Sequence, residues 1–211
     1  MIPTHSGRPV RRTGPIPIAG RRATGEEIIL AASIEVMSEH GYHGTSVRDI
    51  AERAGLSPAA LYHHFSSKHD VLATIMDRGI EELLSRTRTA LQSAGDDPPD
   101  RLRALVAVHV LFHLEDQRGT LLGTSEVRGL EEPVRSEHLA KRQQQQRMFD
   151  GVVSDGTQRR AFRTEYPQEA SRAVVVMCTG VASWYHPEGP LTREEIAQRY
   201  QVLALDLVGA A

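Results

Sequence analysis

At 211 residues, 40% of them hydrophobic, the chain is long enough for one or two domains with a buried core. Its 25 Lys and Arg nearly balance its 27 Asp and Glu, which argues against a protein that coats nucleic acid over its whole surface. No apolar run is long enough to span a membrane and no secretory block opens the chain, so a cytoplasmic protein is expected. The single cysteine, Cys178, can form neither an internal disulfide nor, by itself, a thiolate metal site.

The first segment of the chain is basic. Several arginines precede Glu26, the first acidic residue, among Gly and Pro residues that do not form a regular element. Residues 1–23 are therefore predicted to be a flexible basic arm. This arm either follows the phosphates or the minor groove of DNA or is merely a solvated tail.

From residue 24 onward, apolar residues recur with the helical period of about 3.6. The stripe that starts at Ile28 predicts a helix that Gly41 ends, a second helix starts at Thr45, and a long helix from about Ser67 is interrupted by DDPP at 96–99. No alternating run predicts a strand, so the fold is expected to be all-α. Further helices are predicted near residues 100–117, 119–130, 133–155, 167–185 and 192–208.

The stretch TSVRDIAERAGLSPAALYHHFSSK, which begins at Thr45, contains the start and stop signals of two short helices. Thr45 or Ser46 suits a helix N-cap, and Gly55 can adopt the left-handed conformation that ends a helix. Ser57 caps the next helix, and Pro58 occupies its first position, where the missing N–H costs nothing. The pattern predicts a helix-turn-helix, which is either a DNA-reading unit or an ordinary corner of a helical bundle.

This stretch, continued through HDVL, resembles the DNA-binding domain of the TetR family of transcriptional regulators. In that family a Thr-opened helix, an I-A-x-x-A-G turn and an L-Y-x-H-F segment followed by Lys recur together, and the resemblance covers about residues 24–80. It implies an N-terminal helix-turn-helix domain of three helices at 24–70 and a C-terminal helical ligand-binding and dimerisation domain at 71–211. The segment that begins ASWYHPEGPLTREEIAQRY is loosely similar to members that respond to acyl-CoA thioesters in fatty-acid or steroid breakdown.

A recognition helix brings small or polar residues of its first turns to base edges in the major groove of double-stranded DNA. The resemblance implies that Arg48 grips a guanine, although it could instead pair with neighbouring acids such as Asp49. It also implies contacts with backbone phosphates from Thr45, Tyr62, His64 and Lys68. The predicted DNA-binding residues are Thr45, Ser46, Arg48, Ser57, Pro58, Ala59, Ala60, Tyr62, His63, His64 and Lys68.

Two histidines invite a metal interpretation. His109 and His113 stand four residues apart on a predicted helix, a spacing that lets two imidazoles face one metal ion. The sequence HVLFH lacks the glutamate of zinc hydrolases and no third ligand can be placed, so neither a metal nor a cofactor is expected. The histidines remain either pocket contacts or ordinary core or surface residues. The run QQQQ at 143–146 predicts the polar face of a helix.

No catalytic motif of the common hydrolases or nucleotide-binding enzymes is present, and we therefore expect the protein not to be an enzyme. The predicted function is a ligand-responsive repressor that a small apolar effector releases from its operator, with an acyl-CoA as one candidate effector. The alternative is a helical enzyme or partner-binding protein whose helix-turn-helix is only structural.

The C-terminal part is expected to pair two subunits and to enclose the effector. Two recognition helices about 34 Å apart match a palindromic operator, so we predict a homodimer joined by a four-helix bundle. That bundle would use EASRAVVVMCTGVASWY and the stripe of Ile196, Tyr200, Leu203 and Leu207. The candidates for contacts with CoA phosphates are Arg103, Arg142 and Arg147. The predicted pocket residues, each of which could instead be packed core, are Leu105, His109, Phe112, His113, Met148, Val152, Met177 and Trp184.

Overall fold

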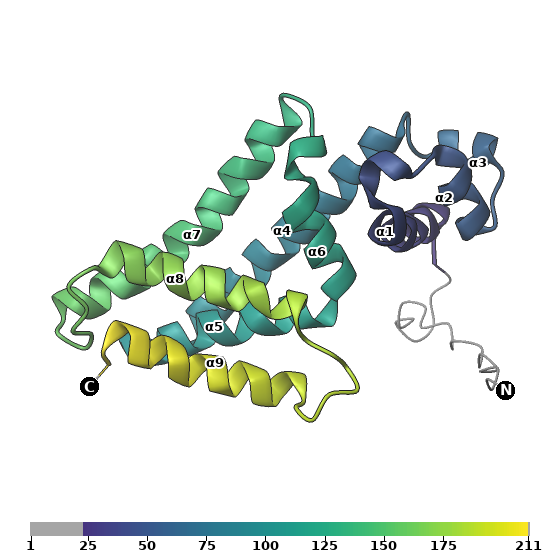
Figure 1. Cartoon of the computed structure of the whole chain (residues 1–211). Helices are drawn as coiled ribbons and strands as arrows, with labels where there is room; N and C mark the ends of the chain where they lie inside the picture. Colours follow the sequence, from purple (N-terminus) through teal and green to yellow (C-terminus); the bar gives the residue numbers. More distant parts are fainter. Residues whose placement is uncertain (1–22, 211) are drawn as a thin grey trace, which may run out of the picture.

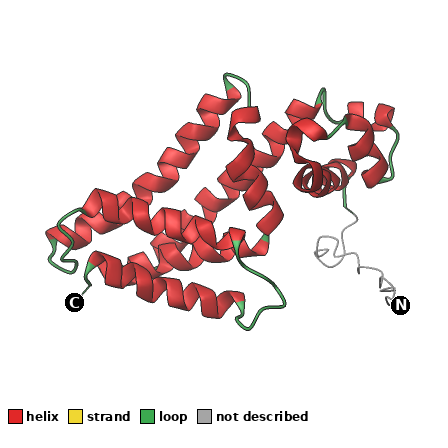
Figure 2. Ribbon diagram, viewed as in Figure 1, coloured by secondary structure: helices red, strands yellow, loops and turns green. Residues whose placement is uncertain are grey.

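The computed structural model describes residues 23–210, and every regular element in this part of the chain is helical (Figures 1 and 2). The predicted all-α fold is confirmed. Apart from residue 23, the predicted basic arm lies outside the described residues. None of the helices in this range combines the length and apolar character needed to cross a membrane. The α-helices are α1 (Gly25–Gly44), α2 (Val47–Ala54), α3 (Pro58–Tyr62), α4 (Lys68–Ser93), α5 (Pro98–Glu115), α6 (Gln117–Ser125), α7 (Val134–Gln158), α8 (Pro167–Gly180) and α9 (Arg193–Val208).

The short helices begin and end where the local sequence predicts. The hydroxyl of Ser46 accepts the backbone N–H of Asp49, whose carboxylate accepts the N–H of Ser46 in return, and this capping box starts α2. Gly55 ends α2 with a φ of 68°. Ser57 then caps α3 through the N–H of Ala60 at 3.1 Å. These signals produce the tight turn between α2 and α3.

Three helices end differently from the prediction. Gly41 has a φ of 72° and kinks α1 instead of ending it, because one more turn follows up to Gly44. The helices predicted to continue to 130 and 185 end sooner and tighten into 3-10 turns, at Glu126–Gly129 (η1) and Val181–Ser183 (η2).

A first apolar cluster holds α1, α2 and α3 against the start of α4. Leu61 of α3 and Ile50 of α2 are completely buried in it. Leu122 of α6 and Leu130, which follows η1, belong to the same cluster, so the C-terminal half of the chain packs directly on the helix-turn-helix. In Figure 1, α1, α2 and α3 form a compact group at one end of the molecule, and α4 runs from it into the remaining helices.

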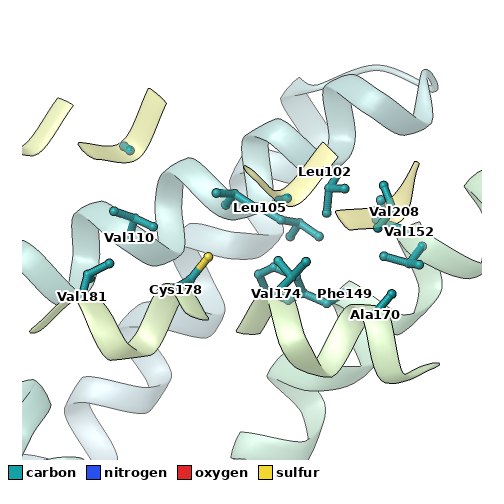
Figure 3. Close-up of a cluster of buried hydrophobic side chains, with 14 of the residues drawn as sticks. Leu102, Leu105, Val110, Phe149, Val152, Ala170, Val174, Cys178, Val181 and Val208 are labelled. Atoms are coloured by element: carbon teal, nitrogen blue, oxygen red, sulfur yellow. The ribbon is translucent and has the colours of Figure 1, made fainter. Parts of the chain in front are cut away.

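A second and larger cluster lies among α5, α7, α8 and α9 (Figure 3). Phe149 of α7, Val174 of α8 and Leu105 of α5 meet there with no exposed surface. Helix α4 lies beside this core and adds a third, small cluster of Ile80, Leu83 and Leu84, against which Phe112 and Met148 pack. Helix α4 thus crosses residue 70, the predicted domain boundary, without interruption and contributes apolar side chains to both halves.

Because Gly55 has a positive φ and its Cβ position is free of neighbours, a side chain there strains only the backbone. We expect Gly55→Ala to lower the free energy of unfolding by about 1 kcal/mol. Gly151 is an exposed position in the interior of α7 and is equally free of neighbours, so Gly151→Ala should instead raise stability, by up to about 1 kcal/mol. Urea denaturation of the two variants measures this, and equal shifts would contradict the left-handed cap.

Candidate nucleic-acid interface and ligand pocket

Helix α3 is anchored on one side and exposed on the other. Leu61 is fully buried, whereas Pro58, Ala59 and His63 are exposed and the side chain of Tyr62 has 55% of its surface exposed. Ala60 is half-buried. The exposed face therefore offers small apolar groups at the start of the helix, where thymine methyl groups would meet it, and polar groups at its end.

Helix α2 contributes a cation beside this face. Arg48 is exposed in its first turn, and within residues 23–210 it has no ion-pair partner. The pairing with Asp49 that the sequence left open is absent, because the carboxylate of Asp49 caps α2 at Ser46. The cation that pairs with acids here is Arg53, which bonds to Glu35 and Glu39. Arg48 thus keeps its planar donor groups available.

Thr45 and Lys68 lie differently from the expectation that they face phosphates. Thr45 is 2% exposed, and its hydroxyl donates to the carbonyl oxygen of Gly41 at 2.8 Å. The Nζ of Lys68 donates to the carbonyl oxygens of Tyr42, at 2.7 Å, and Thr45, at 2.6 Å, and lies over the Tyr42 ring. Both side chains therefore close the junction of α1 and α2. The reason is the kink at Gly41, which leaves carbonyl groups in need of donors.

Three other predicted residues of the helix-turn-helix are exposed. Ser46 and Ser57 are at the surface while their hydroxyls cap α2 and α3. His64 is exposed as well, and its Nε2 lies so close to Gly25 that a Cβ there would approach it to 2.7 Å. The ring of His64 therefore sits at the beginning of α1, next to where residues 1–22 join the fold.

A pocket of about 320 Å³ lies between the helix-turn-helix and the C-terminal helices. Its walls come from α1, α4, α5, α6, α7 and α8, and they include Leu30 and Ile34 of α1 as well as Ile75 and Met76 of α4. The volume is at the lower end of the range that small-molecule sites occupy. A molecule in this pocket would touch helices of both halves of the chain.

Of the predicted pocket residues, His109, Phe112 and His113 line this pocket. The other predictions are corrected by the packing. Leu105 and Val152 belong to the solid core of α5, α7, α8 and α9, and Met177 packs against that core. Met148 packs beside α4 with the small third cluster. Trp184 is at the surface, 46% exposed, and stacks on Tyr200 with the ring centroids 6.3 Å apart.

The sequence reasoning missed most of the polar wall. Gln145 is 3% exposed and His138 is 7% exposed, and both line the pocket from α7. The prediction that QQQQ forms the polar face of a helix does not hold for Gln145, because this position of α7 turns toward α4 and α5. A spacing of seven residues between His138 and Gln145, about two helical turns, was the signal that could have found them.

Three histidines of the wall are uncharged at neutral pH. Burial lowers the pKa of His113 to about 4, helped by the charge of Arg142. Burial and then the neighbouring His113 hold the pKa of His109 well below its usual value, and burial and Arg142 lower the pKa of His138. The rings of His109 and His113 lie 4.4 Å apart. Over residues 23–210, however, no group of three His, Cys, Asp or Glu residues is arranged to hold a metal ion.

Of the three arginines considered for CoA phosphates, only Arg142 lines the pocket. Arg103 lies elsewhere, paired with Asp100 in the first turn of α5. The sequence did not single out Arg86, which also lines the pocket but is held between Glu82 and Glu115 at 2.6 Å from each. Within the part of the chain that the structure describes, Arg142 has no ion-pair partner.

Several large apolar side chains are exposed on α8, on α9 and between them. Val176, Val202 and Leu203 have 71%, 58% and 48% of their surface exposed. Leu207 lies on the same outer side of α9, whereas Ile196, predicted for this surface, is 2% exposed and packs in the core. We call Val176, Trp184, Val202, Leu203 and Leu207 the α8–α9 face.

Two family models match the sequence of this chain. "Bacterial regulatory proteins, tetR family" matches residues 29–75, and "Tetracyclin repressor-like, C-terminal domain" matches residues 95–208. The chain belongs to the TetR family. The HTH-type transcriptional repressor KstR2 of Mycobacterium tuberculosis is 30% identical over 185 residues, which cover 86% of this chain and 90% of that protein.

Solved structures of TetR-family regulators have the same fold. The ketosteroid transcriptional regulator KstR2 of Mycobacterium tuberculosis superposes with a TM-score of 0.84 at 25% identity and covers 92% of this chain and 100% of that one. AibR, in complex with isovaleryl coenzyme A and operator DNA, has a TM-score of 0.78 at 23% identity and covers 89% and 100%. The resemblance noted in the sequence is confirmed.

The buried histidines of this TetR-family protein make its stability depend on pH. Below about pH 6.5 the unfolded chain protonates them while the folded chain does not, so stability falls as the pH drops from about 6.5 toward about 4. His113 alone accounts for up to about 3 kcal/mol of this loss.

We expect His113→Gln to reduce the difference between the free energies of unfolding at neutral pH and at about pH 5, measured by urea denaturation. Thr120→Val, a pocket change without a titrating group, should leave this difference unchanged.

Proposed function

We propose that this TetR-family protein is a ligand-responsive transcriptional repressor. It binds a palindromic operator as a homodimer and leaves the operator when a small apolar effector occupies the pocket. The observation that carries the proposal is the position of the pocket, whose wall is built in part from α1 and α4, the helices that hold the recognition helix. An effector in such a pocket contacts the DNA-binding half directly.

The exposed side of α3 supports the DNA-binding step. Pro58 and Ala59 lie at its start, where they can contact thymine methyl groups, and Tyr62 and His63 carry donors at its end. Arg48, exposed and unpaired within residues 23–210, can grip a guanine at O6 and N7. Lys68 has two of its three N–H groups committed to backbone carbonyls and acts through the shape of the α1–α2 junction.

The α8–α9 face supports the pairing of subunits. Its large apolar side chains are exposed in one subunit, and an isologous contact with a second copy would cover them in a bundle of α8 and α9 from both chains. Two recognition helices held in this way could meet successive major grooves of an operator with matching half-sites.

Release follows if the effector prefers one arrangement of α1 and α4. A ligand whose affinity for the two arrangements differs by ~100-fold shifts their equilibrium by about 2.7 kcal/mol. AibR shares the fold and was crystallised with isovaleryl coenzyme A and operator DNA, and the relative KstR2 is a repressor. For this chain, an acyl-CoA effector is supported by an apolar pocket whose wall carries Arg142, which has no ion-pair partner within residues 23–210.

We expect a variant with both Tyr62→Ala and His63→Ala to lose about tenfold or more of its affinity for a palindromic fragment selected with the wild-type protein. Its fold should persist because both side chains are exposed. Fluorescence anisotropy measures the affinity, and His186→Ala, an exposed histidine of the α8–α9 loop, is the control.

Lys68→Ala is expected to weaken binding only together with a lower melting temperature, since its ammonium holds two carbonyls. If the variant with Tyr62→Ala and His63→Ala binds the fragment as tightly as the wild type, the helix-turn-helix is purely structural. Wild-type affinity that is indifferent to salt would contradict operator binding through phosphates.

A charge placed on the α8–α9 face should separate the subunits. We expect Val176→Asp combined with Leu203→Asp to sediment as a monomer and to bind the operator fragment more weakly, because each carboxylate would be buried without a partner. Leu121→Asp is the matched control, since Leu121 is 41% exposed on α6 outside this face. A wild-type protein that sediments as a monomer at micromolar concentration would refute the dimer.

A further inference from the structure

The buried polar atoms that lack a hydrogen-bond partner are concentrated in one place. Over the described residues they are Nδ1 of His113, Nδ1 of His138, Oγ1 of Thr120 and Oε1 of Gln145. All four residues line the pocket between the helix-turn-helix and the C-terminal helices. Buried polar groups are nearly always bonded in folded proteins, and leaving one unbonded costs stability. Their gathering around one cavity indicates that a bound molecule completes them.

The hydrogen bonds of Gln145 determine which of its amide atoms faces the pocket. The hydroxyl of Thr87 donates to the carbonyl oxygen of Leu83 at 2.7 Å, and a carbonyl oxygen can only accept. The oxygen of Thr87 must therefore accept from Gln145, whose Nε2 lies 3.0 Å away. The amide oxygen of Gln145 is left as a buried acceptor without a donor.

The neighbouring histidine has no proton to give to that oxygen. Nε2 of Gln145 also lies 3.4 Å from Nδ1 of His109, which accepts. Nε2 of His109 then carries the ring proton and donates to the hydroxyl oxygen of Thr179 at 3.0 Å. Both ring nitrogens of His109 are thus occupied. The proton of the Thr179 hydroxyl remains for an acceptor in the pocket, because within residues 23–210 that hydroxyl has no hydrogen bond other than the one to His109.

Most charges of the wall are already balanced, and the exposed Arg142 is its one cation without an ion-pair partner within residues 23–210. Arg86 is balanced by Glu82 and Glu115, and the carboxylate of Asp116 caps α6 at Gly119. His113 is uncharged at neutral pH because of its burial. A carboxylate placed against Oε1 of Gln145 would bring no hydrogen, and two acceptor oxygens would oppose each other. An uncharged donor fits instead.

We propose that the pocket is a site for hydroxylated apolar molecules: the buried part of the ligand is an aliphatic or alicyclic skeleton whose hydroxyl group donates to Oε1 of Gln145. The inference rests on the proposed function only for the statement that this ligand is the effector. It specifies the effector further, since an acyl group buried here would carry a hydroxyl.

The test compares uncharged and charged probes of one size on the full chain without DNA. Isothermal titration measures the binding of 1-octanol, of heptyl methyl ether, which lacks the donor, and of octanoate, which lacks it and is charged. We expect 1-octanol to bind about tenfold tighter than the ether, as one buried acceptor left without a donor costs about that factor. Equal binding of alcohol and ether, tighter binding of octanoate, or no binding of any probe would overturn the proposal.

Variants assign the preference to Gln145. Gln145→Met keeps the length of the side chain and removes the acceptor, so alcohol and ether should bind it equally. Gln143→Met, the same change at an exposed position of α7 outside the pocket, should keep the tenfold preference. If Gln145→Met fails to fold, Thr87→Val serves in its place, because it frees the amide to turn and should reduce the preference. A preference retained in the folded variant would overturn the proposal.

The operator assay separates this proposal from the proposed function. A protein that binds its operator fragment but shows no preference for the alcohol refutes the hydroxyl site alone. A protein that prefers the alcohol through Gln145 but does not bind the selected fragment refutes the repressor and leaves the hydroxyl site standing.

Discussion

The burial of one long helix in two separate sets of apolar contacts is the constraint on which the rest of the molecule depends. Val71, Leu72, Ile75 and Met76 of α4 pack with the helix-turn-helix, and Leu84, a little over two turns beyond Met76, packs beside the C-terminal core. Because α4 is a continuous helix, a tilt at one end cannot be absorbed in the middle. The position of the recognition helix is therefore tied to the packing around the pocket.

The first residue of α4 adds hydrogen bonds to these apolar contacts. Lys68 starts α4, and its ammonium joins the carbonyls of Tyr42 and Thr45 where α1 ends and α2 begins. Charge-assisted bonds of this kind are stronger than neutral ones, and here they are partly shielded from water. The start of α4 is thereby joined to α1 and α2 by polar contacts as well as to α3 by apolar ones.

Local signals in the sequence predicted the helices well, but they could not predict the long-range contacts. The caps at Ser46 and Ser57 and the left-handed Gly55 depend on neighbours within four residues, so the sequence displays them directly. Thr45 and Lys68 have the residue types of phosphate contacts, yet they turn inward because a kink more than twenty residues before Lys68 exposes carbonyl groups to them. No periodicity could show this.

The pocket was predicted less completely, for a related reason. Helical period tells which face of α5 is buried, but Leu105 and His109 share that face and only the packing of α4 and α7 decides which meets a cavity and which meets solid core. The burial of Gln145 could not be predicted, because nothing in the sequence distinguishes it from the other three glutamines of the run. Its burial is paid for by a partner on α4, Thr87, which no local pattern connects to it.

The hydrogen bond between Gln145 and Thr87 connects the pocket to α4, the helix that follows the helix-turn-helix, in addition to the apolar contacts. Thr87 lies on α4 and bonds to the backbone of the same helix at Leu83, and Gln145 brings α7 into the same chain of hydrogen bonds. A ligand that donates to Gln145 would polarise this chain and strengthen the bond between α7 and α4. A ligand that only fills the apolar end would press on Leu30 and Met76 without engaging it. Helix α4 thus meets the pocket in two ways, through Ile75 and Met76 at its apolar side and through the bond of Thr87 to Gln145.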